Sequence, residues 1–310
     1  MKTLGMIGVT VLSTVAIFAT SAAAASPVDK GSGRDAILGV QVHLDRAAFP
    51  VGEIDGRWGA NTERAIRAFQ RAHDLAPSGT VDAATAAALG PEVRTLVAYT
   101  ITADDVAGPF VVIPQDMMAK AKLPAAGFSS PLEMFAERAH ASPALLRALN
   151  PRKAFDAAGT EVMLPNVGGT SPAPAKSVVV DGSDLSVQVL DEQEKVIARY
   201  PASVGSEHDP LPVGPWTIKG VARNPKFHYD PDLFWDADRK DEAATIPPGP
   251  NNPVGVVWID LSKDHYGIHG TPEPSRISRS ESHGCIRLTN WDAATLAEQV
   301  KPGTPAVLRK

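Results

Sequence analysis

The spacing of the hydrophobic residues changes at residues 168–177, a segment rich in Gly, Pro and Ala. Before it, apolar residues recur at intervals of three and four, the period of an amphipathic helix. After it, residues 185–190 alternate with period two, a polar turn follows, and residues 196–200 repeat the strand pattern. We therefore expect a multidomain chain in which residues 168–177 are a linker between helical units and a mainly-β unit. A length of 310 residues suits two or three domains.

The first 25 residues have the pattern of an export signal. Lys2 is followed by an apolar stretch over residues 4–19 and then by a run of alanines, with a predicted cleavage site after Ala25. A retained membrane anchor is the alternative, although the apolar stretch is near the lower length limit for a span. No later segment is apolar for long enough to cross a bilayer. The sequence thus predicts an exported protein of the periplasm or cell wall.

Charge and cysteine content exclude several classes of protein. The net charge of −5 argues against a nucleic-acid partner, and 44% hydrophobic residues are enough for packed cores. Cys285 is the only cysteine. An intramolecular disulfide is therefore impossible, and so is a zinc site that needs two thiolates from this chain.

Residues 35–90 read as a small all-α unit of three helices. Asn61 is placed to cap a helix that runs to Ala72, with Ile66 and Phe69 on its apolar face. Asp82 is placed to cap a second, Ala-rich helix that stops at Gly90. The unit contains no nucleophile with a nearby base, so we expect it to do no chemistry.

The same residues resemble the peptidoglycan-binding domain 1 family, which has a D-G-x-x-G-x-x-T-x-x-A-[IV]-x-x-F-Q run before a G-x-[VL]-[DG]-x-x-T turn. The resemblance implies binding to the glycan or peptides of the wall. The matching positions are Asp55, Gly56, Gly59, Thr62, Ala65, Ile66, Phe69, Gln70, Gly79, Val81, Asp82 and Thr85.

Residues 98–167 read as a small α+β unit with two short helices, at 132–139 and 143–149, before a strand at 161–165. This order resembles a LysM module. It departs from that family at residues 102–126, a stretch of about 25 residues where LysM units have only a few. Glycan binding and a spacer role are both open for this unit.

Beyond the linker, residues 178–310 are predicted to form a mainly-β domain with one helix at 291–300, which the pair Thr289 and Asp292 would cap. Residues 227–252 contain many Asp, Pro and aromatic residues without a clear period, which predicts a long ordered loop. Further strands are expected at 216–221, 254–261 and 305–308.

Cys285 lies in the segment with the clearest chemical signal. A cysteine nucleophile needs a base, and His269 and His283 are both close in sequence. His283 would share a face with Cys285 in an extended strand, while His269 would approach from a neighbouring strand. Gly270 and Gly284 permit backbone amides to approach an oxyanion closely.

Two other interpretations of these residues remain open. A lone cysteine is often an inert core residue. His269, His283 and Cys285 also supply three ligands of the kind that zinc prefers, although the H-E-x-x-H spacing is absent.

The segment resembles the catalytic domain of the L,D-transpeptidases, the YkuD family, whose signature is a His followed after a variable loop by S/T-H-G-C. Here the signature is His269-Gly270 and Ser282-His283-Gly284-Cys285. The resemblance runs from about Val178 to the C-terminus and includes Pro212-Val213-Gly214-Pro215-Trp216. At Arg287 some members of the family have Asn, so the role of that residue is less defined.

The resemblance implies a role for each of these residues and requires no cofactor. Cys285 would be the nucleophile and His269 the proton acceptor and donor, oriented by the carbonyl of Gly270. His283 and Gly284 would shape the pocket and, with the Cys285 amide, the oxyanion site. Arg287 and Ser282 would contact substrate, with a purely structural salt bridge as the alternative for Arg287.

The implied reaction begins with attack of the cysteine on the third residue of a peptidoglycan stem tetrapeptide, with loss of D-Ala. The acceptor would be another stem peptide, a lipoprotein side chain, or water in a carboxypeptidase. The resemblance also implies acylation by β-lactams of the carbapenem type. A zinc-dependent wall hydrolase and a non-catalytic wall-binding protein are the remaining alternatives.

Overall fold

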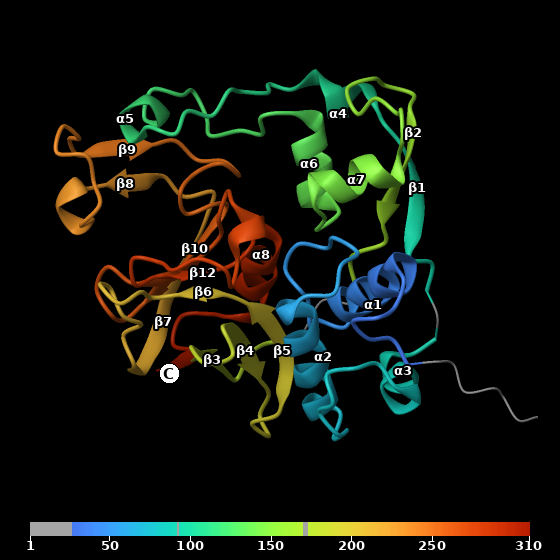
Figure 1. Cartoon of the computed structure of the whole chain (residues 1–310). Coiled ribbons are helices and arrows are strands. Elements are labelled where there is room, and N and C mark those ends of the chain that lie inside the picture. The colour runs from blue at the N-terminus through green and yellow to red at the C-terminus, as the bar shows by residue number, and fades with distance from the viewer. Residues whose placement is uncertain (1–26, 92, 170–172) are drawn as a thin grey trace, which may run out of the picture.

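A computed structural model describes residues 27–91, 93–169 and 173–310 (Figure 1). The predicted export signal and its cleavage site lie outside the described residues, as does the middle of the predicted linker. No helix among the described residues is long and apolar enough to cross a membrane.

The N-terminal unit has the three predicted helices: α1 (Arg34–Arg46), α2 (Ala60–Ala72) and α3 (Ala83–Leu89). Ile66 and Phe69 are almost completely buried, as their spacing predicts.

One of the two predicted helix caps is confirmed. The Asp82 side chain accepts a hydrogen bond from the Thr85 amide at 2.8 Å, at the start of α3. The prediction for Asn61 is wrong, because α2 begins at Ala60, two residues before the expected start at Thr62, and follows an extended Gly59. The Asn61 side chain instead donates to the backbone carbonyl of Ile277, in the C-terminal domain, at 3.4 Å.

The middle unit pairs β1 (Leu96–Thr100) with β2 (Glu161–Pro165) in an antiparallel ribbon. Between them lie the two predicted helices, α6 (Pro131–Arg138) and α7 (Pro143–Leu149). The long stretch after β1 forms α4 (Ala103–Ala107) and then an arm, defined here as residues 108–130, which contains α5 (Met117–Lys120). Figure 1 shows the arm running from α4 across to the β8–β9 region and back to α6.

The N-terminal and middle units share one continuous hydrophobic cluster rather than two separate cores. The Ile54 amide donates to the His140 carbonyl at 2.8 Å, and the Ser142 amide donates to the Ile54 carbonyl at 2.9 Å. Backbone bonds of this kind fix the two units in one orientation.

The C-terminal domain is built on a nine-stranded sheet of order β5-β4-β3-β13-β7-β10-β11-β12-β6. Although β5 and β6 stand at opposite ends of this order, only Ala202 separates them along the chain. The sheet must therefore curl until its two ends approach, which gives a barrel-like fold around a second buried cluster. The strands are β3 (Ser177–Asp181), β4 (Ser186–Leu190), β5 (Val196–Pro201), β6 (Ser203–Val204), β7 (Gly214–Arg223), β10 (Val257–Leu261), β11 (Gly267–His269), β12 (Ile286–Arg287) and β13 (Pro305–Arg309).

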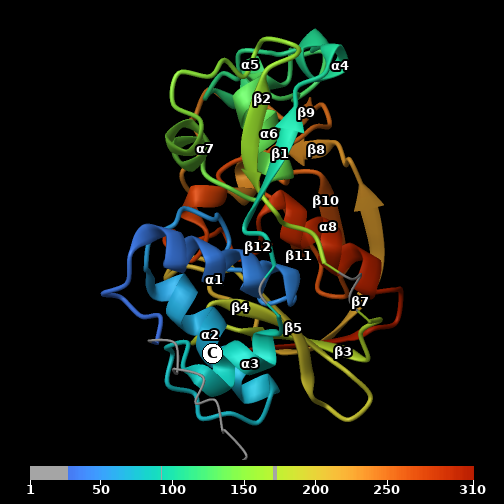
Figure 2. The ribbon, with the colours of Figure 1, turned by 90° about the vertical axis from the view of Figure 1, so that its right-hand side faces the viewer.

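A single α-helix of this domain, α8 (Asn290–Gln299), packs against β10 and β11 (Figure 2). Its predicted cap is confirmed, because the buried Thr289 hydroxyl accepts from the Asp292 amide at 3.1 Å.

Two details of the β domain differ from the sequence prediction. Residues 227–252 are not an irregular loop throughout, because they form the hairpin β8 (Phe227–Tyr229) and β9 (Ala244–Ile246) around a short 3-10 helix, Pro231–Leu233. The strand expected from Val254 begins only at Val257, since Gly255 turns the chain with a φ of +63°.

Candidate active site

Parallel pairing of β11 with β12 brings the predicted catalytic residues together. The register sets Ile268 opposite Ile286 and His269 opposite Arg287, and Cys285 immediately precedes β12. His269 and Cys285 line one cavity of about 1100 Å³. The neighbouring-strand approach expected for His269 is confirmed.

The imidazole of His269 is held in its neutral form. Its ring is buried, and Nδ1 lies 2.7 Å from the Gly270 carbonyl oxygen. A carbonyl can only accept, so Nδ1 carries the proton and Nε2 has the free lone pair. Burial lowers the pKa of His269 to about 4, and the charge of Arg287 adds to this. The Trp258 ring stacks on the imidazole with centroids 5.4 Å apart.

Cys285 is half-buried, and its Sγ donates a weak hydrogen bond to the His265 carbonyl at 3.7 Å. Burial raises the pKa of the Cys285 thiol, and the nearby Arg287 only partly opposes this. The thiol and the imidazole that share this cavity are therefore both neutral at rest, and a thiolate would form only by transfer of the thiol proton.

The conformation of the turn before Cys285 depends on two small residues, Gly284 and Ser282. Gly284 has a φ of +90°, and a Cβ there would lie 2.7 Å from Cε1 of Tyr266. The buried Ser282 donates its hydroxyl to the Cys285 carbonyl at 2.5 Å, while its amide donates to the Gly205 carbonyl at 3.1 Å. Ser282 thus faces inward and holds the turn, rather than facing the cavity.

Residues 283–285 form a bend and not the expected extended strand, and His283 lines the same cavity as Cys285. Its Nε2 lies 2.8 Å from Oδ1 of Asp236, and its Nδ1 lies 3.4 Å from Nη2 of Arg287. A guanidinium can only donate, so Nδ1 accepts and Nε2–H donates to Asp236. Phe234 and Trp235 also contact the His283 ring, with centroids 5.2 and 5.8 Å away.

Arg287 lines the cavity and donates to the Glu281 carbonyl at 3.3 Å as well as contacting His283. The Arg287 guanidinium therefore contacts the turn that leads to Cys285 and also lines the cavity. The position is compatible with a substrate carboxylate and with a structural role.

Several residues around the site were not predicted from the sequence. Asp236, Phe234 and Trp235 come from the 227–252 segment, and Trp258 comes from β10. The density of Asp and aromatic residues marked that segment as ordered. It did not indicate which of them would reach His283, because pairings across some 50 residues depend on the tertiary fold.

Among the described residues, no group of three or more His, Cys, Asp or Glu side chains is arranged to hold a metal ion. The three residues considered above as zinc ligands, His269, His283 and Cys285, thus do not gather into such a group.

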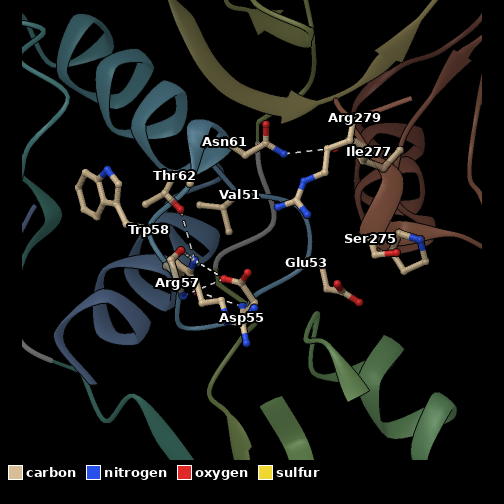
Figure 3. A pocket seen from close by; sticks show the side chains of 13 residues that line it. Val51, Glu53, Asp55, Arg57, Trp58, Asn61, Thr62, Ser275, Ile277 and Arg279 are labelled. Atoms are coloured by element: carbon tan, nitrogen blue, oxygen red, sulfur yellow. Dashed lines mark hydrogen bonds between the residues drawn. The ribbon is translucent and has the colours of Figure 1, made fainter. Parts of the chain in front are cut away.

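A second, smaller cavity of about 200 Å³ lies between the N-terminal unit and residues 274–279 of the C-terminal domain (Figure 3). Glu53 of the N-terminal unit and Arg279 of the C-terminal domain both line it, and Asn61 joins the two parts by its bond to Ile277. Burial raises the pKa of Glu53 to about 7; Asp55 reinforces this and Arg279 opposes it.

Comparison with protein families finds two matches in this chain. The model of the L,D-transpeptidase catalytic domain (YkuD) matches residues 175–308, and that of a peptidoglycan binding domain matches residues 34–89. The LysM resemblance of the middle unit has no counterpart among these matches.

Comparison with individual proteins points to the same family. YkuD of Bacillus licheniformis, named as an L,D-transpeptidase, is 32% identical over 148 residues, which are 47% of this chain and 73% of the relative. YkuD of Bacillus subtilis is 30% identical over 167 residues, which are 54% of this chain and 85% of the relative. The Escherichia coli protein YbiS, also named for this activity, is 25% identical over 57% of this chain and 60% of its own length.

Solved L,D-transpeptidases match more weakly. One from Mycobacterium smegmatis has a TM-score of 0.34 at 20% identity, over 51% of this chain and 77% of its own. One from Xylanimonas cellulosilytica has a TM-score of 0.37 at 16% identity, over 88% and 93%. These scores are below 0.5, so membership rests on the sequence matches.

The protein is an enzyme of the cysteine-dependent acyltransferase class. More narrowly, the chain belongs to the L,D-transpeptidase family, which functions in peptidoglycan cross-linking, and it carries a peptidoglycan-binding domain ahead of the catalytic one. Its work on the wall places it outside the cytoplasm.

Proposed function

We propose that the protein is a peptidoglycan L,D-transpeptidase that forms an acyl-enzyme on Cys285. The observation that carries this is the neutral His269, with its Nε2 lone pair free, in the same cavity as the only thiol of the chain. That arrangement suits a base that accepts a proton from sulfur as the nucleophile attacks.

In the first step, Sγ of Cys285 attacks the carbonyl carbon of the third residue of a stem tetrapeptide, and Nε2 of His269 takes the thiol proton. The amides of Gly284 and Cys285 are the proposed donors to the oxyanion. As the tetrahedral intermediate collapses, the C–N bond to D-Ala breaks and His269 returns the proton to the departing amine. The products are a thioester and free D-Ala.

In the second step, an amine attacks the thioester carbonyl, His269 accepts a proton from it, and Cys285 leaves and is reprotonated. With another stem peptide as acceptor, the product is a 3→3 cross-link. A lipoprotein side chain as acceptor gives an anchored protein, and water gives an L,D-carboxypeptidase.

The other predicted site residues take supporting roles in this proposal. Ser282 and His283 position the turn that carries Cys285, because one bonds its carbonyl and the other is fixed by Asp236. Arg287 is the candidate for a substrate carboxylate, since its fork suits bidentate contact.

Mass spectrometry of the products formed from purified disaccharide tetrapeptide tests the proposed reaction. Loss of D-Ala with formation of a cross-linked dimer supports the transpeptidase, and release of tripeptide alone indicates the carboxypeptidase. Activity that survives EDTA and is stopped by iodoacetamide supports the thiol mechanism, whereas loss in EDTA restored by zinc would favour the hydrolase.

The cavity between the N-terminal unit and residues 274–279 is our candidate for contact with the glycan. It mixes carboxylate, guanidinium and amide groups from Glu53, Arg279 and Asn61, which suits a ligand rich in hydroxyl groups. Glu53→Gln combined with Arg279→Ala should reduce the fraction of the protein that sediments with intact sacculi. Sedimentation equal to that of the wild type would contradict this assignment.

For the middle unit we propose a LysM-like spacer. Its strand–helix–helix–strand order is compatible with that module, and it shares a core with the N-terminal unit.

A further inference from the structure

The arm, residues 108–130, reaches the candidate active site from the middle unit. Three of its residues, Gln115, Asp116 and Met117, line the same cavity as Cys285 and His269. The stretch that sets this unit apart from a LysM pattern is therefore the stretch that extends over to the catalytic domain (Figure 1).

Specific backbone contacts hold the arm against the catalytic domain. The Ala126 amide donates to the Pro248 carbonyl, and the Asn251 amide donates to the Ala126 carbonyl, each at 2.9 Å. The buried Asn251 side chain also donates to the Gly127 carbonyl at 2.9 Å. A Cβ at Gly249 would lie 2.2 Å from the Ala126 oxygen, so this fit depends on glycine there.

The arm is also fixed along its own length. Its outward and return legs are joined by a 3.0 Å bond from the Val111 amide to the Phe128 carbonyl. At its far end Asp116 caps α5, because its carboxylate accepts from the Ala119 amide at 2.6 Å. The three lining residues are thus presented to the cavity by a supported segment.

We propose that the arm is a specificity-determining wall of the enzyme, with Gln115 and Met117 contacting the stem peptide away from its reacting carbonyl. This inference rests on the proposed transpeptidase function. The cavity is larger than the reacting residue alone needs, at about 1100 Å³. An amide and an adaptable thioether suit contact with a peptide backbone and its side chains. Binding energy from contacts at the arm can stabilise the transition state at the reacting carbonyl.

The test uses the full chain with Gln115→Ala and Met117→Ala combined. Val112→Ala is the matched control, since Val112 is on the arm, is 90% exposed and is not among the residues that line the cavity. We expect kcat/KM for the tetrapeptide to fall about tenfold or more in the double variant and to stay unchanged in the control. Acylation by a carbapenem, which is much smaller than the stem peptide, should proceed within about twofold of the wild-type rate.

A second variant, Gly249→Val, disturbs the contact between the arm and residues 248–251 and leaves the cavity-lining residues of the arm unchanged. It should lower kcat/KM for the tetrapeptide in the same way and leave carbapenem acylation intact. If both variants keep the wild-type kcat/KM, the proposed role of the arm is wrong, and the proposed transpeptidase function is unaffected. A wild-type enzyme that is acylated by the carbapenem but never turns over the tetrapeptide would overturn the proposed function and this inference with it.

Discussion

The chemistry of the site is set at the level of single residues, by burial and by one hydrogen bond. His269 is neutral because it is buried, and its Nδ1 proton is fixed by Gly270. Residue type and spacing predicted Cys285 with His269 or His283 as its base, and the resemblance to the L,D-transpeptidases implied His269. The sequence could not predict that His283 faces Asp236, because this depends on a bend at residues 283–285 and on a segment far away in the chain.

The lowered pKa of His269 predicts an unusual pH profile for acylation. Between pH 5.5 and 7.5 the imidazole stays neutral, so the second-order acylation rate should be nearly flat and should fall only as the pH approaches about 4. Stopped-flow or mass-based rates measured from pH 4 to 8 check this. A half-maximal rate near pH 6.5 would show an ordinary, exposed histidine instead.

At the scale of elements, regular helices and strands followed local patterns. The α7 and β2 bounds match the prediction residue for residue, and β10 differs only where Gly255 turns the chain. The β8–β9 hairpin was missed because its two short strands pair across a long insertion without alternation of apolar residues. Nor does any local pattern indicate where the arm docks.

The cap of α8 should make a measurable contribution to stability. Thr289→Ala removes the acceptor for the Asp292 amide and should lower the free energy of unfolding by about 1 kcal/mol. Thr289→Ser keeps the hydroxyl and serves as the control, with most of that stability retained. Denaturant titration of the three proteins makes the comparison, and equal midpoints for the alanine and wild-type chains would rule out this contribution.

At the scale of the whole molecule, buried ionisable groups lie where the units meet. Glu137 on α6 accepts a hydrogen bond from the Asn290 side chain on α8 at 3.2 Å. Burial raises the pKa of Glu137 to about 8; Glu133 adds to this effect, while His140 and the bond from Asn290 oppose it. The carboxyl is therefore protonated in the folded protein at neutral pH.

This raised pKa predicts that stability is lost as the pH rises. The folded state binds a proton that the unfolded state has released above about pH 4.5, so the stabilisation is complete below that value and disappears through pH 8. Glu137→Gln keeps an oxygen for Asn290 without the titration. At pH 8.5 the free energy of unfolding of Glu137→Gln should exceed that of the wild type by about 4–5 kcal/mol, and most of this difference should be gone near pH 5. Thermal unfolding across this range is the measurement, and parallel curves would contradict the assignment.

Covalent labelling of the full chain tests the central claim, that Cys285 is the nucleophile and His269 its base, most directly. Intact mass is followed against time with a carbapenem for the wild type, Cys285→Ala, His269→Ala and His283→Ala. We expect one adduct on the wild type, none on Cys285→Ala, and a roughly 10²–10⁴-fold slower reaction for His269→Ala. His283→Ala should react far faster than His269→Ala. An adduct that persists in Cys285→Ala, or a wild-type rate in His269→Ala alongside a slow His283→Ala, would contradict the account.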